Sequence, residues 1–67
     1  MSPRKIGKKL KKVRLSLDLK QVDVAGRAGI SVNYYARIER DEENPTIETL
    51  EKILKVLKVK SSDILPF

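Results

Sequence analysis

Four side chains on the outward side of the segment 32–40 are suited to contacting DNA. Arg37 can donate two hydrogen bonds to the O6 and N7 atoms of guanine, and Asn33 can pair with the N6 and N7 atoms of adenine. Val32 can pack against the methyl group of thymine, and Tyr34 can donate its O–H to a phosphate. Each of them alone would be an ordinary surface residue, but their grouping on one predicted helix favours base recognition.

The segment 21–40 is predicted to form two short helices joined by a tight turn, which is a helix-turn-helix. Ala25 is small at the point where the two helices must touch. Gly29 occupies the turn, where a positive φ is common after a helix, and Ser31 is a suitable N-cap for the second helix. The residues spaced to point inward are Val24, Ala28, Ile30, Tyr35 and Ile38, and those left facing outward are Val32, Asn33, Tyr34, Arg37 and Arg40.

A first helix is expected before this motif, from about Pro3 to Ser16 or Leu17. Asp18 should end it, because Asp tolerates the left-handed backbone conformation better than most residues other than Gly. Arg14 lies at the edge of the apolar face of this helix, and a buried Arg needs an acceptor. The apolar face consists of Ile6, Leu10, Val13 and Leu17.

The remaining helices follow from the same periodicity. We expect the motif helices at 21–28 and from 32 to 39 or 40, a further helix at 47–57 with Thr46 as its N-cap, and a last short helix near 61–65. No strand pattern competes with them, so the fold class is all-α. The core stripe of the helix at 47–57 consists of Ile47, Leu50, Ile53, Leu54 and Leu57.

The chain of 67 residues is expected to form a single domain, and its net charge is +6. Residues 1–40 hold eleven Lys or Arg and three Asp or Glu, whereas residues 41–67 hold four and six. The positive excess therefore lies on a basic arm at residues 1–5, on the first helix and on the helix-turn-helix. This asymmetry favours a polyanionic partner over a surface that is charged only for solubility.

Several other classes of function are disfavoured by composition. The sequence has no Cys and no His, so disulfides and the usual zinc sites are excluded, and we expect no metal and no cofactor. An enzyme is also disfavoured, because no Ser lies beside an apparent base and no Gly-rich phosphate loop occurs. No apolar run approaches the length that crosses a bilayer, and the start of the chain lacks a signal-peptide core, so we expect a soluble, cytoplasmic protein without membrane contact.

The ordered set of residues between Ile6 and Leu65 resembles the Cro/phage-repressor helix-turn-helix superfamily, often called the XRE family. Each mark is weak alone, and their order and spacing together carry the resemblance. The marks are Arg14, Leu19, Gln21, Val24, Ala25, Gly29, Ile30, Ser31, Tyr35, Ile38, Glu39, Asn44, Pro45, Leu50, Leu57 and Val59.

The resemblance implies a compact five-helix, lambda-repressor-like domain whose third helix enters the major groove. It implies that Val32, Asn33 and Arg37 face the bases and that Tyr34 touches the DNA backbone. Gln21 is similar to the Gln that binds a phosphate in this family and can brace the third helix.

The resemblance also implies a partly buried ion pair between Arg14 and Glu39, which would position the third helix. Lys20 replaces the usual Ser or Thr cap of the second helix, and this change loses a cap but offers a phosphate contact. Ser31 is chiefly a cap, although the exposed N-terminus of its helix can also bind a phosphate.

The loop after the third helix departs from the pattern, because Asp41, Glu42 and Glu43 are acidic where phosphate is often near. We expect these three residues to face away from DNA. Arg40 and Asn44 would then lie nearest the DNA backbone.

Two functions fit this sequence. The first is a sequence-specific transcriptional regulator, which we expect to be a repressor that binds double-stranded DNA as a homodimer at a pseudo-palindromic operator. The alternative is a protein-interaction module of the same fold, such as an antitoxin that binds a toxin. The acidic residues 41–43 and the apolar residues Ile64, Leu65 and Phe67 could serve such a protein partner.

Overall fold

The computed structural model describes residues 6–58, which form helices and no strand. The helices are α1 (Ile6–Ser16), α2 (Gln21–Ala28), α3 (Val32–Glu39) and α4 (Ile47–Leu57). The all-α class is therefore confirmed for this part of the chain, as are the expected bounds of the last three of these helices. The arm at 1–5, the start of the first helix at Pro3 and the short helix near 61–65 lie outside the described residues, so the five-helix count is not confirmed.

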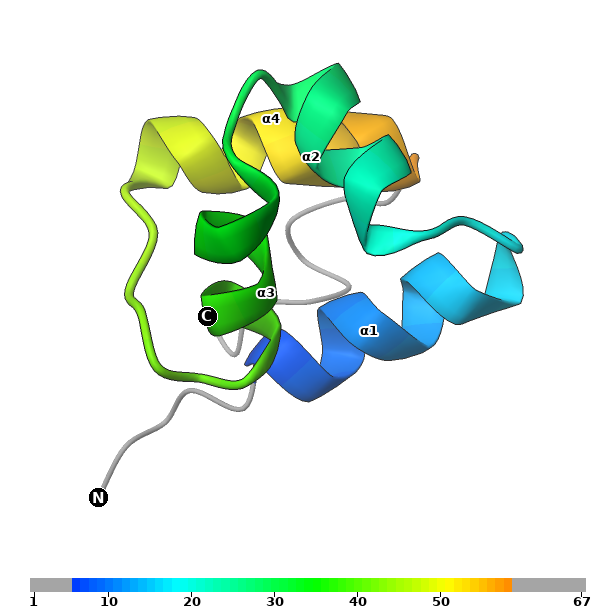
Figure 1. Ribbon diagram of the computed structural model, residues 1–67, viewed down its shortest axis with the longest axis horizontal. Coiled ribbons are helices and arrows are strands. Elements are labelled where there is room, and N and C mark those ends of the chain that lie inside the picture. Colours follow the sequence, from blue (N-terminus) through cyan, green and yellow to red (C-terminus); the bar gives the residue numbers. More distant parts are fainter. Residues whose placement is uncertain (1–5, 59–67) are drawn as a thin grey trace.

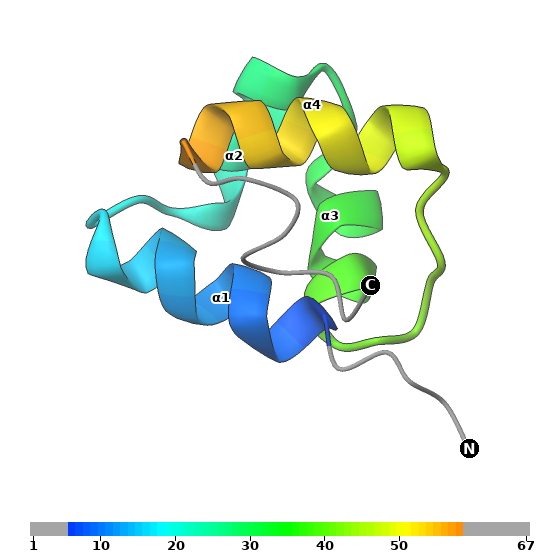
Figure 2. The ribbon, with the colours of Figure 1, turned by 180° about the vertical axis from the view of Figure 1, so that it is seen from behind.

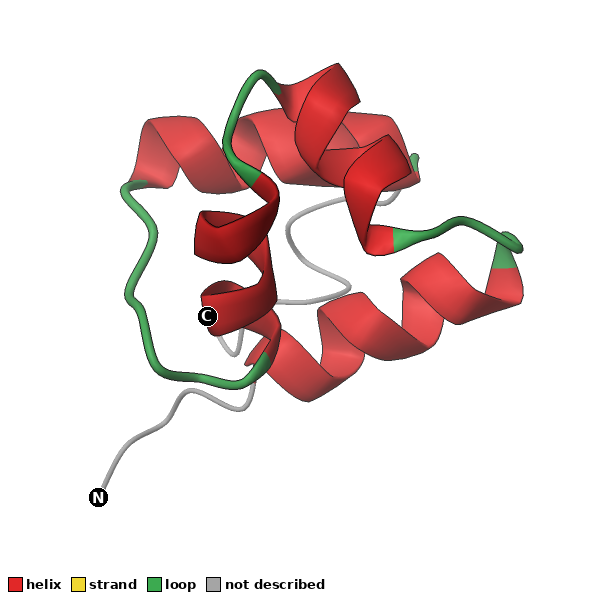
Figure 3. Ribbon diagram, viewed as in Figure 1, coloured by secondary structure: helices red, strands yellow, loops and turns green. Residues whose placement is uncertain are grey.

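The four described helices pack around one core, and α3 stands upright where α1 and α4 run roughly horizontally (Figure 1). α2 contacts both α3 and α4, and α1 contacts α3. Seen from behind, α1 and α4 lie in front and α3 lies beyond them (Figure 2). Short loops make the connections except between α3 and α4, where a longer loop follows the edge of the molecule (Figure 3). None of the helices in the described range is long and apolar enough to cross a membrane.

The core confirms most of the predicted inward positions. The apolar residues that are fully or almost fully buried are Leu10, Val24, Ala25, Ala28, Tyr35, Ile38, Leu50, Ile53, Leu54 and Leu57. Ile6, Val13, Leu19, Ile30, Tyr34 and Val56 are partly buried against them.

Two predicted core residues are wrong. Leu17 is 43% exposed, because α1 ends at Ser16 and the chain then turns away at Asp18. Leu19 provides the apolar contact instead. Ile47 is 62% exposed, because it is the first residue of α4 and the burial of this helix begins one turn later, at Leu50.

Each described helix is followed, at its C-terminal end, by a residue in the left-handed conformation. Asp18, Asp41 and Lys58 have φ values of 59°, 60° and 58°, and Gly29 has a φ of 75°. The N–H of Leu19 donates to the carbonyl of Arg14 at 3.1 Å, which makes the end of α1 a Schellman motif. The prediction that Asp18 ends the first helix is confirmed.

Gly7 allows α1 to approach the end of α3 closely. A Cβ atom at this position would collide with the backbone carbonyl oxygens of Ile38 and Glu39. The N–H of Gly7 also donates to the Asp41 carboxylate at 3.1 Å, so the first turn of α1 is tied to the residues after α3. Gly26 is different, because nothing lies within 4 Å of a Cβ built there.

These two glycines offer a matched pair of substitutions. Gly7→Ala should lower the free energy of unfolding by about 1–3 kcal/mol, because the added methyl group forces backbone apart. Gly26→Ala should raise it by about 0.5–1 kcal/mol, because Ala favours a helix interior over Gly. Urea denaturation measures both. Equal effects of the two substitutions would contradict the close approach of α1 to α3.

Candidate DNA-binding surface

The turn between α2 and α3 fixes the direction in which α3 leaves the core. The N–H groups of Gly29 and Ile30 donate to the carbonyls of Gly26 and Ala25, at 3.3 and 3.0 Å, in a second Schellman motif. The Ser31 hydroxyl then accepts from the N–H of Tyr34 at 3.1 Å, which confirms Ser31 as the N-cap of α3. A motif that ends α2 and a cap that begins α3 thus lie within three residues. Together they fix the backbone conformation of the turn.

α3 is buried along one side and exposed along the other. Tyr35, Ile38 and Glu39 are buried, and Tyr34 is half-buried. The predicted base-reading residues Val32, Asn33 and Arg37 are exposed, and so are Ser31, Lys20, Arg40 and Asn44. The structure therefore places the first three together on the outward side of one helix, as expected, with Ser31 at its start.

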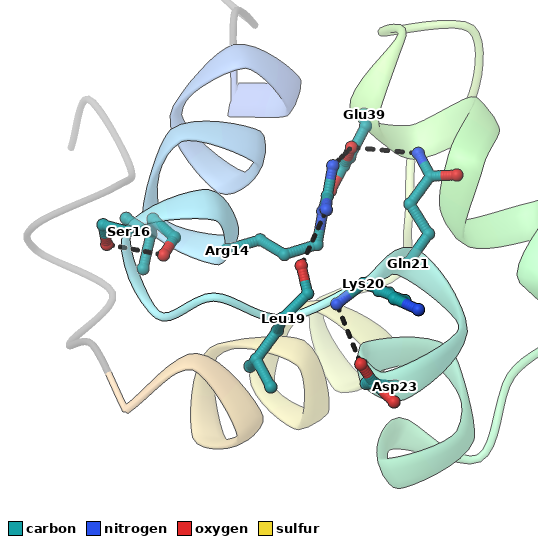
Figure 4. Close-up of polar contacts among 8 residues, drawn as sticks. Arg14, Ser16, Leu19, Lys20, Gln21, Asp23 and Glu39 are labelled. Atoms are coloured by element: carbon teal, nitrogen blue, oxygen red, sulfur yellow. Dashed lines mark hydrogen bonds and ion pairs between the residues drawn. The ribbon is translucent and has the colours of Figure 1, made fainter.

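A buried ion pair joins α1 to the end of α3 (Figure 4). Arg14 Nε donates to Glu39 Oε2 at 2.6 Å, and Arg14 Nη2 donates to Glu39 Oε1 at 3.1 Å. The third nitrogen of the guanidinium, Nη1, donates to the Leu19 carbonyl at 2.9 Å. Arg14 and Glu39 are only 7% and 5% exposed, so the expected pair is present and is more deeply buried than expected.

Gln21 brings α2 into the same network. Its side-chain Nε2 donates to Glu39 Oε1 at 3.0 Å, so the carboxylate of Glu39 receives bonds from both α1 and α2 (Figure 4). Gln21 thus braces α3, which is one of the two roles that the resemblance implied. Its phosphate contact stays a prediction.

The charged form of Glu39 is favoured by these bonds. Burial alone would raise the pKa of the Glu39 carboxyl, but hydrogen bonds from Arg14 and Gln21 hold the pKa below its ordinary value of 4.5. The same pairing with Glu39 raises the pKa of Arg14.

Tyr35 lies beside this network. Burial raises the pKa of its hydroxyl, and the nearby Glu39 carboxylate adds to the rise. The hydroxyl is nevertheless buried without a hydrogen-bond partner.

Lys20 precedes α2 as an unusual N-cap. A lysine ammonium cannot accept a bond, and the cap is made in the opposite direction, since the Asp23 carboxylate accepts from the N–H of Lys20 at 2.9 Å (Figure 4). This arrangement is half of a capping box. The side chain of Lys20 is left on the exposed side of the motif.

The acidic loop corrects an expectation from the sequence. Asp41 does turn toward α1, where it accepts from Gly7. Glu42 and Glu43 do not face away from the proposed surface, because each contacts one of its arginines. Glu42 accepts from Arg40 Nε and Nη2 at 3.0 and 3.2 Å, and Glu43 lies 3.4 Å from Arg37 Nη1.

The sequence reasoning missed these two contacts. Arg40 and Glu42 are two residues apart across a helix end, and Arg37 and Glu43 are six apart. Only the left-handed turn at Asp41 brings both carboxylates back beside α3. The signal available in the sequence was the run of three acidic residues, 41–43, directly after the segment 32–40.

Comparison with known proteins supports the geometry. Residues 10–64 match the sequence model of the helix-turn-helix family. The chain belongs to this family. The proposed resemblance is therefore confirmed, and the family match covers all of the described site from Arg14 to Asn44.

The relatives are regulators of transcription. The chain is 39% identical over 59 residues to the immunity repressor of Bacillus phage phi105, covering 88% of this chain and 41% of the relative. It is 32% identical over 56 residues to the transcriptional repressor RstR of the cryptic phage CTXphi in Vibrio cholerae, covering 84% of this chain and 50% of the relative. The chain thus spans half or less of the length of these two relatives.

Solved structures show the same fold. The restriction-modification controller C.AhdI of Aeromonas hydrophila aligns with a TM-score of 0.87 at 23% identity, covering 91% of this chain and 92% of that one. The controller C.Esp1396I, bound to a 25 base pair operator site, aligns with a TM-score of 0.80 at 35% identity. The alignment covers 90% of this chain and 79% of that one.

Loss of Arg14 should mainly affect stability. Arg14→Ala leaves the Glu39 carboxylate buried without its charged partner, and such a change typically lowers the free energy of unfolding by about 3–5 kcal/mol. Thermal unfolding followed by circular dichroism measures the loss. Lys11→Ala, which removes an exposed charge from the same helix, is the control. An unchanged melting temperature for Arg14→Ala would contradict the structural role of the pair.

The same network predicts an acid dependence of stability. Because the folded-state pKa of Glu39 is lowered below 4.5, its stabilising contribution is complete above that value and is lost as the pH falls below it. The free energy of unfolding should therefore decrease with falling pH in this range. Glu39→Gln should make that decrease smaller. Glu42→Gln, which changes an exposed carboxylate, should leave most of the decrease in the free energy of unfolding in place. Identical pH profiles for Glu39→Gln and the unchanged protein would refute this account.

Proposed function

We propose that this protein is a sequence-specific DNA-binding regulator of transcription that acts as a repressor. The observation that carries the proposal is the exposed side of α3, where Val32, Asn33 and Arg37 project from a helix whose other side is buried. The likeness to repressors and to an operator-bound controller supports it. Regulation would follow from occupying a promoter, without catalysis.

Each site residue has a role in this proposal. Val32, Asn33 and Arg37 read base edges in the major groove. Gln21 and Tyr34, together with Lys20, bind phosphates on either side of the groove, while the start of α3 at Ser31 offers its N–H groups to a phosphate. Arg40 and Asn44 extend the backbone contacts along the loop after α3.

The proposed form of binding is a homodimer on a pseudo-palindromic operator. One domain presents a single recognition helix, which covers only a short half-site. Two copies related by a two-fold axis would read two half-sites about one helical turn apart. We treat the chain as one DNA-binding domain over residues 1–67, with the arm at 1–5 as a further source of positive charge.

Selection of bound sequences from a random duplex library tests the function. A symmetric motif with two half-sites is expected, and binding should weaken steeply as salt rises, because phosphate contacts release counterions. The absence of a gel shift at low salt, for a sample shown to be folded, would exclude the proposal.

Arg37 gives a more local test. Arg37→Ala should weaken binding to the selected duplex by about 1–3 kcal/mol and relax the base preference at one position. Arg37→Lys keeps the charge but loses the two-bond geometry, so it should lose nearly as much specificity. Lys52→Ala, on the exposed side of α4, is the charge control. Fluorescence anisotropy on selected and scrambled duplexes measures each. Equal weakening on both duplexes would show that Arg37 contacts phosphate only.

A further inference from the structure

Two arginines are held by carboxylates in different ways: Arg37 on the exposed side of α3, and Arg40 directly after the end of this helix. Glu42 occupies the Nε and Nη2 atoms of Arg40, at 3.0 and 3.2 Å, which is the edge that an arginine uses for a two-bond contact. Glu43 contacts Arg37 at Nη1, at 3.4 Å. Both arginine side chains are more than half exposed, so neither pair is enforced by burial.

This difference decides what each arginine can do while it is paired. Arg37 keeps its Nε and Nη2 edge directed away from the Glu43 contact, and this edge offers two parallel N–H groups. Guanine O6 and N7 accept such a pair. Arg40 must leave Glu42 before it can offer the same edge to a phosphate.

The Glu43 side chain is also less exposed to solvent than that of Glu42. It is 37% exposed against 54% for Glu42, and Glu43 lies two residues before Pro45 in the loop that leads to α4. A long exposed arginine loses side-chain entropy when it binds. A carboxylate that already limits the rotamers of Arg37 reduces that loss.

We propose that Glu43 is a positioning residue for base recognition, which holds Arg37 through Nη1 while its Nε–Nη2 edge binds guanine. This inference rests on the proposed function and specifies its mechanism at one base pair. Glu42 has the opposite effect, because it competes with the DNA backbone for Arg40 and so lowers the affinity for every sequence.

The same substitution at the adjacent residues 42 and 43 distinguishes the positioning role of Glu43 from the inhibitory role of Glu42. Glu43→Gln should weaken binding to the selected duplex about two- to fivefold, the size expected for an exposed ion pair, and should reduce the preference for guanine over the other bases at the Arg37 position. It should not weaken binding to a scrambled duplex. Glu42→Gln, which removes the same charge one residue earlier, should tighten binding to both duplexes by about the same factor.

A double-mutant cycle ties the effect to Arg37. In an Arg37→Ala background, Glu43→Gln should no longer weaken binding to the selected duplex. Glu51→Gln on α4 controls for net charge, and thermal unfolding of each variant controls for folding. Glu43→Ala, which removes every acceptor, should reproduce the loss seen with Glu43→Gln.

The outcomes distinguish this inference from the proposed function. If the unchanged protein prefers no sequence, the proposed function fails and the inference fails with it. If it prefers a sequence through Arg37, but Glu43→Gln tightens both duplexes as Glu42→Gln does, only the positioning role is overturned. Persistence of the Glu43→Gln loss in the Arg37→Ala background overturns it as well.

Discussion

The arrangement of this domain depends on one buried carboxylate, that of Glu39. It receives two bonds from Arg14 on α1 and one from Gln21 on α2, and it lies at the end of α3. A buried ion pair adds little net stability compared with apolar packing, but it is costly to break and it is directional. The bonds to Glu39 therefore fix where the C-terminal end of α3 lies relative to the other two helices. The Schellman turn at Gly29 and the cap at Ser31 fix its other end.

The same end of α3 is shaped by a backbone that turns sharply. Asp41 adopts the left-handed conformation and its side chain accepts from Gly7, so the chain leaves α3 against the first turn of α1. That turn directs Glu42 and Glu43 back toward Arg40 and Arg37. The turn at Asp41 thus connects the packing of α1 against α3 with the ion pairs on the exposed surface.

Much of this fold could be predicted from the sequence because its signals are local. Apolar spacing gave the helices of the motif and α4, and Ser31, Thr46 and Asp18 were recognisable as end signals. The pair of Arg14 and Glu39 came only from the family resemblance, since the two residues are 25 apart and nothing in the sequence joins them.

The remaining features depend on tertiary geometry. Leu19 replaces Leu17 in the core because a left-handed residue between them rotates the chain, which a continuous helical period does not anticipate. Gly7 is required only because the backbone at the end of α3 lies against it, which no local pattern indicates. The contacts of Glu42 and Glu43 required the turn at Asp41, and without it their charge suggested only avoidance of DNA.

The most direct test of the central claim is amide chemical-shift mapping of the folded protein as it is titrated with the selected duplex. The largest changes are expected in the range 31–37, at Lys20 and Gln21, and in the loop 40–44. Changes along the exposed side of α4 are expected to be small. Changes concentrated on α4, with α3 unaffected, would contradict the claim that α3 is the surface that meets DNA.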